Sequence, residues 1–210
     1  MPRTAPAANR SQRLLLTLVA CAGLLVLAFG ALLGYAFRDA HDGAAGSALS
    51  SMIGGKFDLV DQNGKPFSDA DLKGKWQLVF FGYTHCPDVC PTTLNEISLA
   101  FDKLPTAERG KVGVVFISVD PERDTPAVLK EYVASFSAPV TALTGTAAEV
   151  AQAAKDYRVY YAKHPNADGS YDMDHSALIY IMDPQGRFTA SFTPDDTADK
   201  IAERMQKLLS

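Results

Sequence analysis

Basic side chains are scarce in most of this 210-residue sequence. From Ile53 to Ser210 it carries 16 Lys and Arg against 22 Asp and Glu, so this segment is acidic. Because nucleic acid phosphates are bound mainly by Lys and Arg, the deficit argues against a nucleic acid partner. The sequence also lacks an internal repeat, which excludes an architecture built from repeats. Its length allows one full domain with appendages.

Charge is absent from the run Leu14 to Phe37. As a helix its 24 residues would span about 36 Å, enough to cross a bilayer core of roughly 30 Å. The apolar part of a cleaved signal peptide is usually only about 7–15 residues long. The sequence therefore predicts a transmembrane anchor at 14–37, after a cytoplasmic N-terminus at 1–13. Residues 38–52, rich in Ala, Gly and Ser, are expected to be a flexible linker to a domain at 53–210.

Two alternatives to a retained anchor stay open. Residues 34–36 (GYA) are placed as a signal peptidase site prefers, and residues 18–21 (LVAC) look like a lipoprotein cleavage box. The lipoprotein alternative is weakened because sixteen uncharged, mostly apolar residues follow Cys21, where a lipoprotein normally becomes polar. A retained anchor is favoured, and Cys21 is then expected to face lipid.

Charge at the N-terminus predicts the orientation of this anchor. Arg3, Arg10 and Arg13 precede the apolar run, and no acidic residue does. Positive charge beside a transmembrane helix favours the cytoplasmic side. For a bacterial chain this predicts a single-pass inner-membrane protein whose globular domain lies in the periplasm. Paired cysteines can form a disulfide in that compartment.

The segment after residue 52 predicts an α/β domain. Continuous apolar runs at 76–83 and 111–120 indicate buried strands, and turn residues at 63–64 and 183–186 indicate hairpins. A further strand is expected at 158–164, and helices are expected at 88–104, 127–136, 146–157 and 197–209. Thr125-Pro126 and the Thr146/Glu149 pair have the patterns of helix N-termini. This alternation favours a central mixed sheet flanked by helices, compatible with a thioredoxin-like order.

Two of the three cysteines stand four residues apart, and each is followed by a proline. Cys86 and Cys90 are expected between the end of a strand and the first turn of a helix, where backbone N–H groups and the helix dipole lower a thiol pKa. The four-residue offset brings both sulfurs to one side of the helix. Such a pair can exchange disulfides or bind a soft metal. The purely structural alternatives are a static disulfide or two buried apolar cysteines.

Two features of thioredoxin-type oxidoreductases are missing. Three residues, not two, separate the cysteines, and the stretch 171–180 (YDMDHSALIY) has no proline where those enzymes carry a cis-proline. It carries His175 instead. Two thiolates and an imidazole form a soft set of three ligands that suits Cu(I), or Cu(II) with an added oxygen ligand. Structural zinc usually needs four protein ligands, so copper is favoured.

Four blocks of the sequence, in this order, resemble the Sco/SenC family of copper chaperones. They are GYTHCPDVCPTTL (82–94), ISVDPERDTPAVLKEY (117–132), LTGTAAEVAQAAKDYRVYY (143–161) and DHSALIYIMDPQGRF (174–188). The resemblance runs from about Phe57 to Leu208. It implies a thioredoxin-like fold that binds one copper ion through Cys86, Cys90 and His175.

The resemblance also implies a function. Members of this family are membrane-anchored and help to load the dinuclear copper centre of cytochrome c oxidase subunit II, which requires an upstream periplasmic copper donor. The alternative is a thiol–disulfide reductase that keeps the copper-site cysteines of the oxidase reduced, with Cys86 and Cys90 as its redox-active pair. The first role is that of a metallochaperone, and only the second would make the protein an enzyme.

Nearby polar residues are weaker candidates. Asp120 ends a central strand and is either a turn residue or a hydrogen-bond acceptor that orients a metal ligand or a partner. Asp88 either favours the positive end of its helix or tunes the thiols. His85 adjoins Cys86, but in an extended segment its side chain should point to the opposite side. Met173 is expected to pack in the core and not to bind the metal. A peroxiredoxin-like peroxidase is disfavoured, because residues 80–84 lack the usual upstream proline and the usual placement of threonine.

Overall fold

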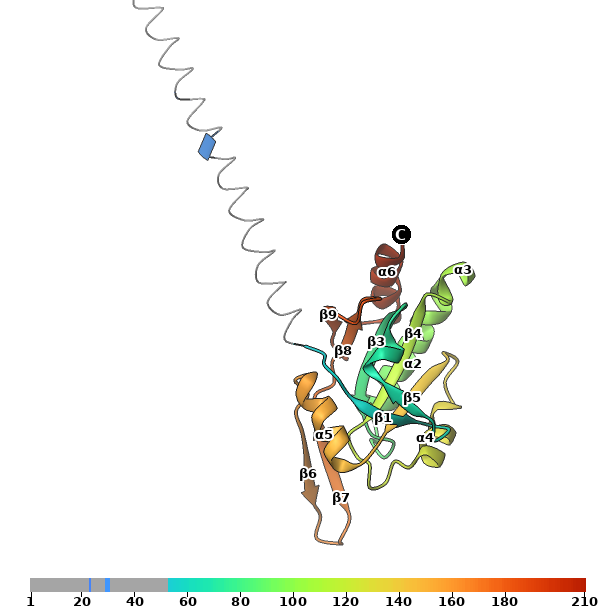
Figure 1. Ribbon diagram of the computed structural model, residues 1–210, viewed down its shortest axis with the longest axis vertical. Coiled ribbons are helices and arrows are strands. Elements are labelled where there is room, and N and C mark those ends of the chain that lie inside the picture. Colours follow the sequence, from blue (N-terminus) through green and yellow to red (C-terminus); the bar gives the residue numbers. More distant parts are fainter. Residues whose placement is uncertain (1–22, 24–28, 31–52) are drawn as a thin grey trace, which may run out of the picture. The chain divides into compact units, whose positions relative to one another are not determined.

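The structure is a computed structural model of the 210-residue chain, and it describes residues 23, 29–30 and 53–210 (Figure 1). By its internal contacts the chain divides into two compact units, Met1–Ser47 and Ala48–Ser210. Apart from three residues, the expected anchor at 14–37 lies outside the described part, as do the N-terminus at 1–13 and the linker at 38–52. Among the described residues, no helix has both the length and the apolar character needed to cross a membrane.

A seven-stranded mixed sheet forms the centre of the larger unit, with the strand order β2-β1-β5-β4-β3-β8-β9. Strand β3 pairs in parallel with β4, and β4 with β5, whereas β1 and β8 join antiparallel to β5 and β3. This confirms the predicted mixed sheet. Its strands are β1 (Asp58–Asp61), β2 (Pro66–Ser68), β3 (Trp76–Gly82), β4 (Val112–Ser118), β5 (Val140–Thr144), β8 (Ile179–Met182) and β9 (Phe188–Phe192).

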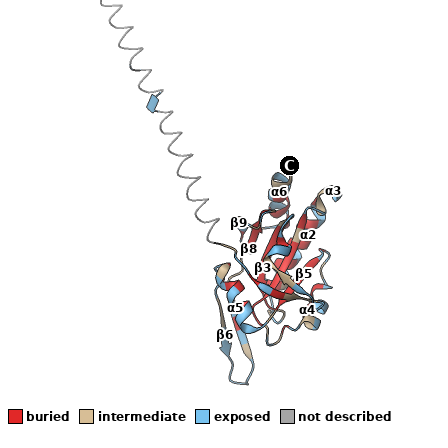
Figure 2. Cartoon of the chain, in the orientation of Figure 1, coloured by how far each residue is buried: buried red, intermediate tan, exposed pale blue. Residues whose placement is uncertain are grey.

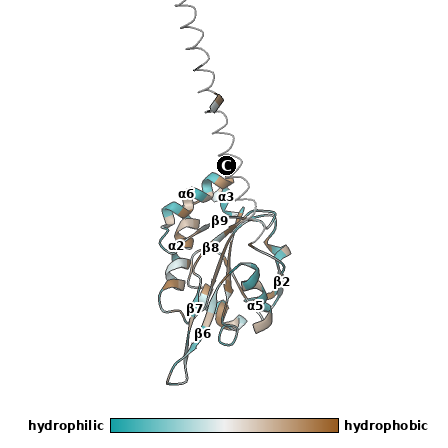
Figure 3. Cartoon of the chain, turned by 90° about the vertical axis from the view of Figure 1, so that its left-hand side faces the viewer, coloured by the Kyte–Doolittle hydropathy of each residue, from teal (hydrophilic) through white to brown (hydrophobic). Residues whose placement is uncertain are grey.

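Helices cover both faces of this sheet. Figure 3 shows α2 and α6 on one side of the sheet and α5 on the other, and α2 and α6 pack against each other. Helix α4 packs beside β5 and helix α5 beside β1. The helices are the 3-10 turn η1 (Asp69–Leu72), α2 (Val89–Lys103), α3 (Thr106–Arg109), α4 (Pro126–Val133), α5 (Ala147–Asp156) and α6 (Ala198–Leu209).

The predicted buried strands form the core. Phe80 and Phe81 of β3 and Phe116 of β4 have no exposed surface, and the buried residues lie along the central strands in Figure 2. Strands covered by helices on both faces have no polar face, which explains why their sequences are continuous apolar runs. The core therefore lies directly beneath the carboxyl end of β3, where the cysteine loop begins.

The predicted helix caps are confirmed. The Thr125 hydroxyl accepts a hydrogen bond from the Val128 N–H, and Pro126 is the first residue of α4. Thr146 and Glu149 form a capping box, in which the Thr146 hydroxyl accepts from the Glu149 N–H and the Glu149 carboxylate accepts from the Thr146 N–H. These caps satisfy backbone N–H groups that would otherwise lack partners.

Four features differ from the sequence-based expectation. Strand β5 was not anticipated. The strand expected at 158–164 begins later, as β6 (Tyr161–Pro165), because Arg158 ends the preceding helix in the left-handed conformation with φ 57°. A strand was also not anticipated at the start of the stretch 171–180, where β7 (Tyr171–His175) pairs with β6 in a separate two-stranded sheet. Helix α4 also ends at Val133, before the expected end at 136.

Candidate metal centre

The cysteine pair lies between β3 and α2, as the sequence predicts. Cys86 is half-buried in the loop that follows β3, and Cys90 is completely buried in the first turn of α2. The Cys90 N–H donates to Cys86 Sγ at 3.4 Å, and no disulfide joins the two sulfurs. A backbone donor aimed at a sulfur stabilises the thiolate form, so the local fold prepares Cys86 to carry negative charge.

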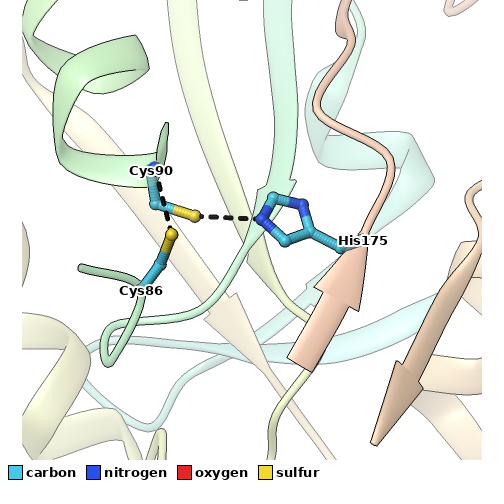
Figure 4. A group of neighbouring side chains, drawn as sticks. All are labelled: Cys86, Cys90 and His175. Atoms are coloured by element: carbon cyan, nitrogen blue, oxygen red, sulfur yellow. Dashed lines mark hydrogen bonds between the residues drawn. The ribbon is translucent and has the colours of Figure 1, made fainter. Parts of the chain in front are cut away.

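His175 completes the group from a distant part of the chain. It is the last residue of β7, and its Nε2 lies 3.3 Å from Cys90 Sγ (Figure 4). Its Nδ1 lies 3.1 Å from the Ser176 carbonyl oxygen, an acceptor, so Nδ1 carries the proton and Nε2 presents its lone pair to the sulfurs. The ring packs edge-on against Phe80 and Tyr83, with centroid distances of 6.1 and 5.7 Å.

The donor atoms of Cys86, Cys90 and His175 all lie within 4.8 Å of one another. In the part of the chain that the structure describes, no other group of three Cys, His, Asp or Glu side chains converges in this way. Two sulfurs and an imidazole nitrogen are soft or borderline donors, and they fit Cu(I) better than a hard cation such as Mg²⁺ or Ca²⁺. The donor set that the sequence suggested is thus brought to one point.

The two thiols differ in acidity. The hydrogen bond from Cys90 lowers the pKa of Cys86 to about 4, against the opposing effect of burial, and the N–H groups of Asp88 and Cys90 and the His175 side chain add to the lowering. The same hydrogen bond and burial raise the pKa of Cys90. The pair therefore shares one proton at neutral pH: Cys86 is the thiolate, and Cys90 keeps its hydrogen.

The two acidic candidates have different surroundings. Asp88 is the N-cap residue of α2, and its carboxylate makes no capping bond but lies 3.5 Å from the Thr92 hydroxyl. Asp120 is buried after β4, where its carboxylate accepts hydrogen bonds from the Tyr171 hydroxyl at 2.7 Å and from Arg123 Nε. Asp88 acts on Cys86 through its backbone N–H, whereas Asp120 is bonded to the strand that carries His175.

The remaining candidates lie outside the three-residue group. His85 is half-exposed, and its Nδ1 lies 3.0 Å from the Thr84 hydroxyl, so it does not join the donor set. Met173 is buried in the core, as expected for a packing residue. His164 is an exposed residue of the β6–β7 hairpin, paired with Asp174 at 2.8 Å.

Asp124 is a residue that the sequence reading missed. Its carboxylate is completely buried and accepts hydrogen bonds from the Thr84 N–H at 3.0 Å, the Thr84 hydroxyl at 2.6 Å and the Ser118 hydroxyl at 2.6 Å. Thr84 stands two residues before Cys86, so Asp124 fixes the start of the cysteine loop. Thr84 and Asp124 are 40 positions apart, so the sequence around Asp124 gave no local signal that it holds the cysteine loop.

Tyr132, a partly buried residue of α4, interacts electrostatically with the cysteines and was also not anticipated. The Tyr132 hydroxyl has no hydrogen-bond partner among the described residues. Burial raises the pKa of Tyr132, and its electrostatic interactions with Cys90 and Cys86 raise it further. The ring packs against that of Phe116, with a centroid distance of 5.7 Å.

Comparison with known proteins points to one family. The SCO1/SenC family model matches residues 45–210. The mitochondrial SCO2 protein of Saccharomyces cerevisiae is 40% identical over 165 residues, which cover 75% of this chain and 54% of the yeast protein. The chain thus spans about half the length of this relative.

Solved structures agree. Bradyrhizobium japonicum ScoI with copper bound is 52% identical with a TM-score of 0.69, over 74% of this chain and 98% of that one. Yeast Sco1 with copper bound is 37% identical with the same TM-score, over 74% and 87% of the chains.

More distant solved relatives add two observations. A SCO1/SenC family lipoprotein from Bacillus anthracis str. Ames is 26% identical, with a TM-score of 0.63 over 76% of this chain and 96% of that one. BsSco, a member of the Sco family of cytochrome c oxidase assembly proteins, is described as having a disulfide switch. It is also 26% identical, with a TM-score of 0.59 over 76% and 94% of the chains.

Proposed function

The chain belongs to the SCO1/SenC family, and on that premise we propose that it is a membrane-anchored copper chaperone. It binds one copper ion through Cys86, Cys90 and His175 and delivers the ion to the dinuclear copper centre of cytochrome c oxidase subunit II. The convergence of the three donor atoms within 4.8 Å of one another is the observation that carries this proposal.

The chemistry of the donors supports copper as the cargo. Cu(I) accepts three ligands in near-trigonal geometry, and Cu(II) is held when an oxygen ligand is added. Cys86 is already a thiolate at neutral pH, whereas Cys90 must release its proton to become a ligand. Uptake of the cargo is therefore coupled to the release of about one proton from the dithiol.

The unequal exposure of the ligands supports transfer to a partner. Cys90 is buried in α2, whereas Cys86 is half-exposed beside Pro87, Asp88 and Val89, all of them exposed. A thiolate from a partner can approach copper on the Cys86 side and replace Cys86 as a ligand. His175 and Cys90 hold the ion during the exchange. As a chaperone, the protein would pass copper to oxidase subunit II and would receive it from an upstream periplasmic protein.

The location follows from the N-terminal residues. The uncharged run at 14–37, after three arginines, supports a retained single-pass anchor in a bacterial inner membrane. The domain at 53–210 then faces the periplasm, at the end of the linker at 38–52. Lipidation at Cys21 and cleavage near residue 36 remain the alternatives.

A thiol–disulfide reductase is the second candidate, and the unequal thiol pKa values favour it. Cys86 thiolate attacks one sulfur of a partner disulfide, a Cys86–partner bond forms, and the other partner sulfur leaves as a thiolate. Cys90 then loses its proton to the nearby Nε2 of His175 or to water and attacks Cys86 Sγ. The partner is released with two thiols, and Cys86 and Cys90 end as a disulfide, so two electrons pass to the partner.

Copper titration of the full-length protein, with its thiols reduced beforehand, tests the first proposal. The wild type is expected to bind one Cu(I) tightly, and Cys86→Ser and His175→Ala are expected to bind it much more weakly. Binding by His175→Ala equal to that of the wild type would remove His175 from the site and leave the reductase ahead.

A further inference from the structure

Strand β7 presents alternate residues to the body of the domain. Tyr171, Met173 and His175 are partly or fully buried, whereas Asp172 and Asp174 between them are exposed. This is the period of two that a strand imposes on its side chains. A slip of one residue would turn His175 toward solvent, so the function of His175 depends on the register and placement of β7.

The main sheet does not fix this placement. Strands β6 and β7 pair only with each other, with His175 opposite Tyr161 and Tyr171 opposite Pro165, and neither strand joins the seven-stranded sheet. A two-stranded ribbon alone is marginally stable in water. Its position relative to the cysteine loop must therefore come from side-chain contacts with the domain.

Tyr171 supplies such contacts at the start of the strand. Its hydroxyl donates to the buried carboxylate of Asp120 at 2.7 Å, and its carbonyl oxygen accepts from Arg123 Nη1 at 3.1 Å. The Arg123 guanidinium lies 3.7 Å from the centre of the Tyr171 ring, and Lys163 Nζ lies 3.8 Å from it. Both the side chain and the backbone of Tyr171 are thus bound to the body of the domain.

The partners of Tyr171 belong to the loop that also holds the cysteine segment. Arg123 Nε donates to Asp120, and the Arg123 N–H bonds to the Asp120 carbonyl at 3.2 Å. One residue later, Asp124 binds both the N–H and the hydroxyl of Thr84. The loop at 120–124 therefore holds the two parts of the chain that carry the donor atoms.

We propose that Tyr171 is a positioning residue for His175: by binding Asp120 and Arg123 it places strand β7 so that His175 Nε2 faces the sulfurs. The inference rests on the proposed copper site and deepens it. Tyr171 does not touch the metal donors and acts through the strand. Loss of a group that is bonded directly to a metal ligand typically weakens metal binding about 10–100-fold, and we expect the loss of Tyr171, one step further out, to lie at the lower end of this range.

The experiment compares Cu(I) affinity, by competition with a chromophoric chelator, in reduced full-length variants. Tyr171→Ala removes all contacts of the Tyr171 side chain. Arg123→Gln removes the guanidinium that contacts the Tyr171 ring and carbonyl oxygen. Tyr171→Phe keeps the ring between the two cations but loses the bond to Asp120. Tyr160→Ala is the matched control, since Tyr160 precedes the same hairpin and is 62% exposed. Each substitution is also made together with His175→Ala.

A second measurement needs no copper. His175 packs edge-on against Phe80 and Tyr83, so the proton chemical shifts of its imidazole ring report its place through ring currents. In the metal-free protein, Tyr171→Ala and Arg123→Gln are expected to move these resonances toward the values of a solvated histidine. Tyr160→Ala is expected to leave them in place.

The expected result is a loss of affinity of at least about 10-fold for Tyr171→Ala and Arg123→Gln, a smaller loss for Tyr171→Phe, and wild-type affinity for Tyr160→Ala. In the His175→Ala background, the Tyr171 substitution should cost nothing further. Wild-type affinity in Tyr171→Ala and Arg123→Gln, or an equal loss with and without His175, overturns the inference while the copper site stands. Undiminished affinity in His175→Ala alone instead overturns the ligand role of His175 and the inference with it.

Discussion

His175 Nε2 lies 3.3 Å from Cys90 Sγ although the two residues are 85 positions apart in the chain. Cys90 is held by the first turn of α2, on the main domain, and His175 by a two-stranded ribbon outside the main sheet. His175 can therefore be replaced without changing either cysteine or the backbone N–H of Cys90. The chemistry of the dithiol and the contribution of the imidazole are thus separable by mutation.

Substitution of His175 by Ala should weaken Cu(I) binding by at least about 10-fold, since loss of a ligand costs no less than loss of an outer contact. Disulfide exchange by Cys86 and Cys90 should largely persist, because both cysteines and the Cys90 N–H are unchanged. Competition with a chelator measures the first, and reduction of a small disulfide measures the second. His164→Ala is the matched control, since His164 is an exposed histidine of the same hairpin. Equal losses in both histidine variants would contradict the prediction.

The acidity of Cys86 should be visible in its reactivity. With a pKa of about 4, Cys86 is a thiolate at every pH above about 6, so its alkylation by iodoacetamide should be independent of pH there and should slow only as the pH falls toward 4. In Cys90→Ala the largest cause of the lowering is gone, and the rate should keep rising up to about pH 8. Mass spectrometry of the alkylated peptide gives the rate. A pH profile that is the same in both proteins would show that Cys90 does not tune Cys86.

Much of this arrangement was predictable from local sequence, and the reasons are physical. The apolar run of β3 and the Thr146/Glu149 cap are signals contained in a few neighbouring residues, and so is the placement of the cysteines at the start of a helix. The partners of Asp124 and Tyr171 are 40 and 51 positions away, so no local pattern points to them. Only the alternation within β7 was available as a signal.

Strand β5, Asp120 and His175 show the same limit. Strand β5 is only five residues long, too short for periodicity to separate it from a loop. Asp120 was anticipated near the site, yet it is bonded to Arg123 in its own turn and to Tyr171, which only the tertiary structure brings to it. His175 was identified through the missing proline and the family resemblance, because a single histidine carries no ligand signal of its own.

Asp124→Asn should destabilise the fold. The buried carboxylate accepts three hydrogen bonds, and an amide would turn one acceptor oxygen into a donor that faces donors. The free energy of unfolding is expected to fall by about 1–3 kcal/mol, as measured by urea denaturation. Asp102→Asn is the control, because the Asp102 carboxylate is exposed and bonds only to the exposed Ser137 hydroxyl among the described residues. A loss no larger than in the control would show that Asp124 does not stabilise the loop at Thr84.

The choice between chaperone and reductase can be made by trapping. A reductase must pass through a disulfide between Cys86 and its partner, and Cys90 resolves it. In Cys90→Ala this intermediate should accumulate, because the half-exposed Cys86 can still attack and no second thiol remains. Cys86→Ala should not trap a partner, because Cys90 is completely buried and its pKa is raised. The probe is the copper-binding domain of oxidase subunit II with its two copper-site cysteines oxidised, and non-reducing electrophoresis reveals the adduct.

The two outcomes of that experiment have different meanings. An adduct that forms with Cys90→Ala and is absent with Cys86→Ala shows attack by the thiolate that the structure makes acidic and accessible, and it establishes reductase chemistry at this site. Without an adduct in either variant, the low pKa of Cys86 serves metal binding, since a thiolate is also the form that ligates copper. If His175→Ala then also binds copper weakly, the imidazole acts as a metal ligand and not as the proton acceptor of a disulfide exchange. The protein would then act as a carrier of the ion.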